Sequence, residues 1–248
     1  MARSFQFIFA GDSTTRRLAD SFEAVYKGSM PSHYYAHKTV EHNVNELSAV
    51  FKWTPHCEEL YGEIAENIEI LRRKRVAKQL VFVTSYGVHD ICGIREFNKE
   101  AHMSPEQTHV LEDAALGRCL HTTQSLIDLA REGAIVMVME GNPFAHWVDE
   151  NRVWMGKLHQ QRMDLFKGEN HDFNLRSQAG GKLQRAMPFM VEDQANLFNR
   201  LECKRIDSVH FYEPVKLTQA QMLWHLMNMV FRCSLDSCVQ WQAGGGEA

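Results

Sequence analysis

A serine lies near the start of the chain at the corner between an apolar run and an amphipathic segment. Residues 5–10 are apolar except for Gln6; Gly11, Asp12 and Ser13 follow, and residues 14–26 carry apolar side chains at helical spacing. A serine hydroxyl needs a neighbouring base, a group that orients this base, and donors for an oxyanion. The first N–H groups of a helix, here those of Ser13 and Thr14, can supply such donors. Ser13 is therefore a candidate nucleophile, and the alternative is that Asp12 or Ser13 simply caps the helix.

The base that would activate this serine is expected near the end of the chain. Asp207 and His210 form the only Asp-x-x-His in the sequence, and Pro214 follows them before a last apolar segment. One loop could then present both side chains, with Asp207 accepting from one imidazole nitrogen while the other faces Ser13. This is the division of roles in Ser-His-Asp triads on unrelated folds.

Short apolar runs alternate with longer amphipathic segments along the chain. We expect strands at residues 5–10, 34–40, 49–53, 80–84, 134–139 and 205–209, a turn-prone segment at 85–93, and helices at 14–26, 58–76, 105–131, 147–166, 191–201 and 218–231. This alternation predicts an α/β protein built from βαβ units, with a mainly parallel sheet. No internal repeat or linker divides the chain, which indicates one domain.

Ligands of such sheets bind beyond the carboxyl ends of the strands. Three polar segments follow expected strands: residues 11–13, residues 85–90 and residues 140–144. In the last of them, Pro143 fixes the course of the loop, and Asn142 with the nearby His146 could line a pocket. A plain connection between a strand and a helix is the alternative.

The Gly-Asp-Ser turn after the first strand, paired with the late Asp-x-x-His, resembles the SGNH (GDSL-type) hydrolase superfamily. Gly11-Asp12-Ser13-x-x-Arg16 is more narrowly similar to the PC-esterase branch, which includes trichome-birefringence-like O-acetyltransferases and sialate O-acetyltransferase domains. The resemblance implies a flavodoxin-like, three-layer α/β/α fold. It also implies a single catalytic domain at residues 1–242, with a flexible tail at residues 243–248.

The resemblance carries roles over to individual positions. It implies Ser13 as nucleophile, His210 as general base and Asp207 as the residue that orients the base. Arg16 would lie near the mouth of the site and hold an oxygen-rich or anionic part of the substrate, or it would be an ordinary solvated helix arginine.

One motif departs from the superfamily. Many members have Gly-x-Asn-Asp after a core strand, whereas this chain has Gly87-Val88-His89-Asp90. His89 could replace the asparagine as an oxyanion donor, contact the substrate, or do neither. Gly87 and His89 therefore join Asp12, Thr14 and Arg16 as candidate oxyanion or substrate residues.

Composition excludes several classes of function. The chain has 248 residues, of which 44% are hydrophobic and 23% charged, and its formal net charge is −4. This balance gives no reason to expect a nucleic-acid partner, and the cations at residues 72–75 are expected to end a helix. No apolar run is long enough for a membrane span. Without a visible export signal the expected location is cytoplasmic, or the secretory pathway if the chain is a piece of a longer protein.

The six cysteines lack Cys-x-x-Cys spacing, which disfavours a zinc site. Reduced, buried thiols are expected, with a possible disulfide between Cys233 and Cys238. His33, His37 and His42 form no recognisable ligand set. We therefore expect no metal and no organic cofactor.

Together these observations predict a serine esterase or O-acyltransferase that works through an acyl-serine intermediate. The resemblance alone suggests small O-acyl groups, acetyl above all, on a carbohydrate. Two alternatives stay open. One is a non-enzymatic carbohydrate-binding or scaffold protein on a degenerate SGNH fold, and the other is a lysophospholipase-type lipid esterase.

Overall fold

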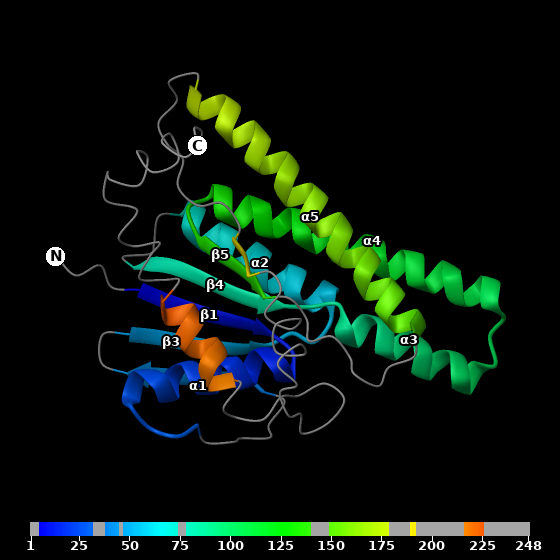
Figure 1. Cartoon of the computed structure of the whole chain (residues 1–248), viewed down its shortest axis with the longest axis horizontal. Helices are drawn as coiled ribbons and strands as arrows, with labels where there is room; N and C mark the ends of the chain where they lie inside the picture. The colour runs from blue at the N-terminus through cyan, green and yellow to red at the C-terminus, as the bar shows by residue number, and fades with distance from the viewer. Residues whose placement is uncertain are drawn as a thin grey trace, which may run out of the picture.

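The computed structural model describes residues 5–31, 38–44, 47–73, 78–139, 149–178, 189–191 and 216–225. Its elements, in chain order and labelled in Figure 1, are β1 (Phe5–Gly11), α1 (Ser13–Lys27), β2 (Val40–Val44), β3 (Leu47–Trp53), α2 (Cys57–Arg72), β4 (Gln79–Ser85), α3 (Val88–Ala101), α4 (Pro105–Arg131), β5 (Ile135–Met139), α5 (Asp149–Gln178) and β6 (Phe189–Val191). Residues 216–225 form a further helix, called helix 216–225 below.

The strands form one sheet in the order β2-β3-β1-β4-β5-β6. β1 pairs in parallel with both β3 and β4, β4 with β5, and β5 with β6, whereas β2 pairs with β3 in the antiparallel direction at one edge. Six of the seven residues of β4 are buried, as expected for a strand that helices cover on both faces. The predicted α/β class with a mainly parallel sheet is confirmed.

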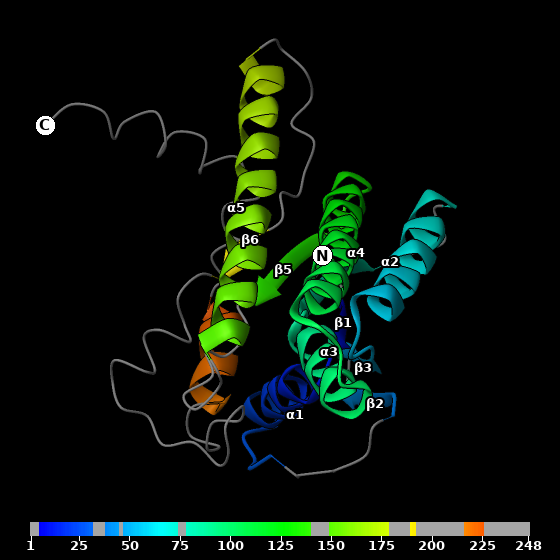
Figure 2. The same ribbon diagram turned by 90° about the vertical axis from the view of Figure 1, so that its right-hand side faces the viewer.

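Helices cover both faces of the sheet because alternate strand residues point to opposite sides. Phe7 and Phe9 pack with residues of α1 and helix 216–225, whereas Ile8 packs with residues of α2, α4 and α5. Figure 2 shows α1 and helix 216–225 on one side of the strands, with α2 and α4 on the other. The predicted three-layer α/β/α arrangement is confirmed.

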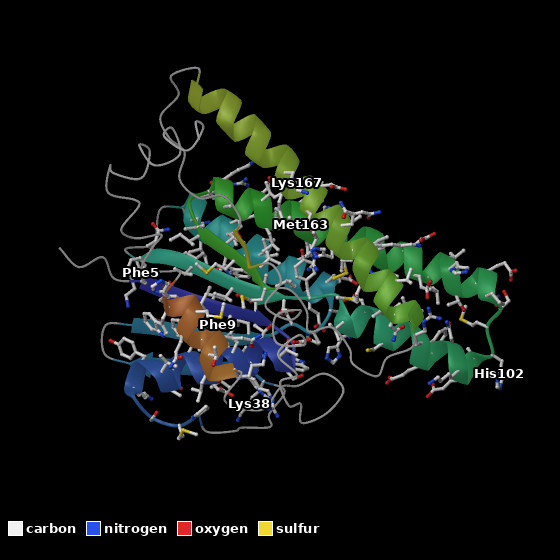
Figure 3. The ribbon with its side chains drawn as sticks, viewed as in Figure 1. Phe5, Phe9, Lys38, His102, Met163 and Lys167 are labelled. Atoms are coloured by element: carbon white, nitrogen blue, oxygen red, sulfur yellow. A yellow bond between two sulfur atoms is a disulfide. The ribbon has the colours of Figure 1, made fainter. Side chains whose placement is uncertain are left out.

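Aromatic stacking fixes helix 216–225 against α1. The rings of Phe22 and Trp224 are nearly parallel, 2° apart in orientation, with centroids 4.3 Å apart. The Trp224 indole N–H donates to the Phe22 carbonyl oxygen at 3.4 Å. Phe9, labelled in Figure 3, belongs to the same buried cluster. The far end of the sequence is thereby packed against its beginning.

Several predicted boundaries agree closely with the structure. The strands predicted at 5–10, 80–84 and 134–139 are β1, β4 and β5, and the helix predicted at 105–131 is α4. α2 ends at Arg72 with Arg73 as its C-cap, so these two cations lie at a helix C-terminus as expected, whereas Lys74 and Arg75 lie outside the described residues. None of the described helices is both long and apolar enough to cross a membrane.

Other predictions need correction. Residues 88–93, predicted as a turn, belong to α3, which begins directly after Gly87 in the left-handed conformation (φ 102°). The polar residues between 85 and 90 suggested a turn, although Val88, Ile91 and Ile94 are spaced as on one face of a helix. β2 begins at Val40, the end of the strand predicted at 34–40, and Val191, predicted to begin a helix, ends β6. The strand predicted at 205–209 lies outside the described residues.

The expectation of reduced thiols is wrong for two cysteines. Cys57, at the start of α2, and Cys119, within α4, form a disulfide with Cα atoms 5.0 Å apart. The two residues are 62 positions apart in sequence, and only the packing of α2 against α4 brings them together. Cys233 and Cys238 lie outside the described residues.

Replacing Phe22 with alanine should destabilise the protein by about 3–5 kcal/mol, because it removes a fully buried ring and leaves a cavity against Trp224. Urea unfolding followed by circular dichroism measures the change. Phe97→Ala is the matched control, since Phe97 is 54% exposed and should lose well under 1 kcal/mol. Equal losses in the two variants would contradict the packing described here.

Candidate active site

The carboxyl ends of three neighbouring strands meet at one edge of the sheet. Gly11, the last residue of β1, is in register with Trp53 of β3 and Ser85 of β4. Gly11 has φ 154°, and a Cβ atom there would lie 2.7 Å from the Ser85 carbonyl oxygen and 2.4 Å from Thr15 Oγ1. Only glycine fits this corner, because a side chain would strain the backbone and collide with its neighbours.

α1 begins at this corner with Ser13 as its first residue and Asp12 as its N-cap. One Asp12 carboxylate oxygen accepts from the Thr14 N–H at 2.8 Å, the Thr14 hydroxyl at 2.6 Å and the Thr15 N–H at 3.3 Å. Asp12 is 2% exposed. The capping interpretation is therefore confirmed for Asp12, while Ser13 is half-buried and its side chain does not form the cap.

The cap uses backbone donors that sequence reasoning had assigned to an oxyanion. The Thr14 N–H donates to the Asp12 carboxylate, and the Arg16 N–H donates to the Asp12 carbonyl oxygen at 3.0 Å. The Thr14 N–H could bind an oxyanion only by giving up its bond to Asp12. The position of Thr14 beside Ser13 thus fits a role in holding the turn.

Arg16 is 5% exposed, so the interpretation as a solvated helix arginine is wrong. Arg17 beside it is 6% exposed. The first turn of a helix disfavours cations, and burial of a guanidinium group is costly without partners. Two buried arginines here are therefore unlike the ordinary surface residues of an amphipathic helix.

A small pocket opens beside the start of α1. Its volume is about 20 Å³, and its lining includes Thr14 and Thr15 of α1, Ser85 of β4, Met139 of β5, and Lys216 and Gln219 of helix 216–225. Lys216 is 3% exposed. The hydroxyls of Thr15 and Ser85 are buried without a hydrogen-bond partner in the part of the chain that the structure describes. The pocket thus combines these two buried, unpaired hydroxyls with polar side chains from helix 216–225.

Sequence reasoning named Thr14 of this lining as a candidate but did not name Thr15, Ser85, Lys216 or Gln219. Ser85 lies at the end of an expected strand, so its position was a usable signal. Nothing in the sequence pointed to Lys216 and Gln219, because they belong to a helix whose partner, α1, is about 200 residues away in the sequence. Only the packed fold brings them to the pocket.

The Gly87 motif forms the N-terminus of α3 after β4. A Cβ at Gly87 would lie 2.5 Å from Leu158 Cδ2 of α5, and φ is 102°, so glycine is required here too. The ring of His89 makes edge contacts with the rings of Trp53 and His56, each with centroids 6.0 Å apart. His89 therefore belongs to an aromatic cluster at the carboxyl ends of β3 and β4.

The remaining predicted site residues, Asn142, His146, Asp207 and His210, lie outside the described residues. In the sequence, His210 precedes the pocket residue Lys216 by six positions, and Asn142 follows the pocket residue Met139 by three.

Cys92 of α3 is the one free cysteine among the described residues. Burial raises the pKa of its thiol to about 12, and the negative charges of Glu96 and Asp12 add to this effect. The thiolate is the nucleophilic form of cysteine, so this thiol is unreactive at neutral pH. Cys92 is not a competing nucleophile for the site.

Comparison with known proteins gives one informative likeness. No family model matches the chain, and no curated protein matches it in sequence. Among solved structures, the chain is similar to a lipase from a goat rumen metagenome, with 13% sequence identity and a TM-score of 0.54. The match covers 89% of this chain and 96% of the lipase. At this identity the likeness establishes a shared fold.

Replacing Asp12 with alanine should destabilise the protein by about 1 kcal/mol, because it leaves the capped N–H groups of α1 without their acceptor. Asp12→Asn retains an acceptor oxygen and should lose less. Ser104→Ala, which removes the N-cap of the distant α4, is the matched control and should cost a similar amount. Urea midpoints measure all three variants. Wild-type stability in Asp12→Ala would contradict the capping role.

Proposed function

We propose that the chain is an SGNH-type serine esterase or O-acyltransferase, with residues 1–242 as one catalytic domain. Its substrates in this proposal are small O-acyl esters, acetyl above all, of a carbohydrate. Ser13 is the nucleophile, His210 the general base and Asp207 the residue that orients this base.

One observation carries the proposal. Ser13 begins α1 at the carboxyl ends of the central strands, and the pocket beside it is lined by Lys216, six residues after His210. The segment that supplies the base is therefore tethered to the corner that supplies the serine. The shared fold with a protein named as a lipase adds support, because a lipase is an ester hydrolase.

The chemistry follows from these roles. The His210 imidazole takes the Ser13 hydroxyl proton while Oγ bonds to the ester carbonyl carbon. Collapse of the tetrahedral intermediate breaks the bond to the alcohol, which takes the proton from the imidazolium and leaves. Water then hydrolyses the acyl-serine, or a second hydroxyl accepts the acyl group. Asp207 stabilises the imidazolium through one ring nitrogen.

In this proposal the pocket beside α1 receives the acyl group. Its volume of about 20 Å³, close to what one water molecule needs, supports a small acyl group over a long one. Arg16, His89, Asn142 and His146 are the proposed contacts to the rest of the substrate. His89 fits this role because it lies with Trp53 and His56 in an aromatic cluster, a surface on which a sugar ring can pack.

The second candidate is a lipid esterase, which the name of the structural neighbour favours. The third, a binding protein without catalysis, has His89 in place of the usual asparagine in its favour. The two predictions below separate these candidates from the proposed function.

A fluorophosphonate probe should label the wild-type protein, because it reacts with an activated serine hydroxyl. Ser13→Ala and His210→Ala should both lose labelling. Ser29→Ala, at an exposed serine, and His102→Ala, at the α3–α4 turn in Figure 3, are matched controls that should keep it. A wild-type protein that stays unlabelled between about pH 6 and 9 would favour the binding protein.

The acyl preference can be measured with p-nitrophenyl esters of increasing chain length. We expect kcat/KM to be at least about tenfold higher for acetate than for octanoate, since 1.4 kcal/mol of unfavourable crowding is enough for that ratio. The reverse order would favour the lipid esterase. Labelled protein that hydrolyses neither ester faster than Ser13→Ala would contradict the proposed substrate class.

A further inference from the structure

A second cluster of reactive side chains lies where α2, α3 and α4 meet. It consists of Cys57, Asp90 and Cys119, one residue from each helix, and all three are buried. Their sulfur and carboxylate oxygen atoms lie within 4.8 Å of one another. The two sulfur atoms form the disulfide described above. The proposed serine chemistry uses none of these residues.

Asp90 is unusual as the neighbour of a disulfide. A carboxylate is costly to bury, and burial raises the pKa of Asp90 above its ordinary value. One Asp90 oxygen accepts from the Cys57 N–H at 3.1 Å, and the other lies 3.9 Å from Nδ1 of His56. A disulfide has no proton to donate, so the two sulfur atoms do not satisfy the carboxylate. A covalent link between α2 and α4 would not by itself require an acid at this position.

Reduction of the disulfide would change the chemistry of this cluster. Two thiolates, a carboxylate and a nearby imidazole are the donor types that zinc takes in tetrahedral protein sites. With Zn–S bonds of about 2.3 Å, ligand sulfur atoms in a tetrahedron are about 3.8 Å apart. The atoms of the cluster already lie within 4.8 Å, so small side-chain rotations suffice.

We propose that, once the Cys57–Cys119 disulfide is reduced, this cluster binds a divalent transition-metal ion, zinc above all, through both thiolates and the Asp90 carboxylate, with solvent or the His56 imidazole beside Asp90 as the fourth ligand.

The surroundings of the cluster support this role. Metal ligands are typically held by hydrogen bonds from a second layer of groups. The Cys57 N–H already orients the Asp90 carboxylate, and the Thr122 hydroxyl donates to the Cys57 carbonyl oxygen at 2.8 Å. Thr122 lies on α4, one turn after Cys119. The backbone that presents the ligands is therefore fixed before any metal arrives.

The conversion of the disulfide form into the metal-bound form balances in atoms and electrons. Two molecules of a low-molecular-weight thiol reduce the disulfide and leave as their own disulfide, which yields the Cys57 and Cys119 thiols. The metal ion then displaces the two thiol protons, which pass to the solvent, and its oxidation state does not change. The disulfide of the same low-molecular-weight thiol can oxidise the two thiolates again, which restores the Cys57–Cys119 bond, returns two thiol molecules and releases the metal.

The test uses the full chain with Cys92, Cys203, Cys233 and Cys238 replaced by serine, so that Cys57 and Cys119 are the only cysteines. Thiols counted after denaturation should number about zero before reduction and about two after it. The reduced protein, titrated with Co²⁺ without oxygen, should bind about one ion with thiolate-to-cobalt charge-transfer absorption and tetrahedral d–d bands. Zn²⁺ should displace the cobalt, and the oxidised protein should show neither signal.

Two further variants in this background identify the ligands. Cys119→Ser should lose most of the charge-transfer absorption. Asp90→Asn keeps both thiols and should weaken Co²⁺ binding by at least about tenfold. Glu96→Gln, at an exposed acid on the same helix α3, is the matched control and should bind as the background protein does.

Circular dichroism verifies that each variant is folded. If Cys119→Ser does not fold, the difference in Co²⁺ affinity between Asp90→Asn and Glu96→Gln tests the proposal instead. Folded, reduced protein without charge-transfer absorption would overturn the proposal, as would equal affinities in Asp90→Asn and Glu96→Gln. Two thiols before reduction would overturn the redox dependence. None of these results depends on Ser13.

Discussion

The pairing of β1 with β3 and β4 is the constraint on which the rest of the structure depends. Parallel hydrogen bonding in register places Gly11, Trp53 and Ser85 side by side, so three connections leave the sheet at one edge. α1, α2 and α3 all begin within a few residues of this edge. The N-terminal N–H groups of these helices therefore collect in one region of the molecule, where those of α1 donate to Asp12 and that of Cys57 donates to Asp90.

Different helices, and different clusters of polar side chains, lie on the two faces of the sheet near this edge. On one face, α1 and helix 216–225 are joined by the Phe22–Trp224 stack, which brings Lys216 to the first turn of α1. On the other face, α2, α3 and α4 enclose Cys57, Asp90 and Cys119. The pocket beside Ser13 and the proposed metal cluster thus lie on different faces of the sheet, while His56 contacts both His89 of the proposed substrate surface and Asp90 of the metal cluster.

Backbone geometry explains why the residues at the edge cannot be exchanged freely. Gly11 and Gly87 both have positive φ and both lie against neighbouring atoms, so each is required by its own turn. Asp12 holds the first turn of α1 with a single carboxylate oxygen. The Gly-Asp-Ser sequence is therefore accounted for at two of its three positions by backbone geometry and helix capping, and the proposed function assigns the third position, Ser13, a role in chemistry.

The sequence by itself determined several of the elements and the α/β alternation, although it missed α3 and β6. Apolar runs predicted β1, β4 and β5, and the segment at residues 105–131 predicted α4, because these patterns depend on the periods of strand and helix. It also indicated Ser13 and Ser85 at strand ends. Only the tertiary structure decided that Cys57 meets Cys119, that Arg16 is buried, and that Lys216 reaches α1. Contacts between distant residues depend on strand order and helix packing, and no local pattern of residues encodes either.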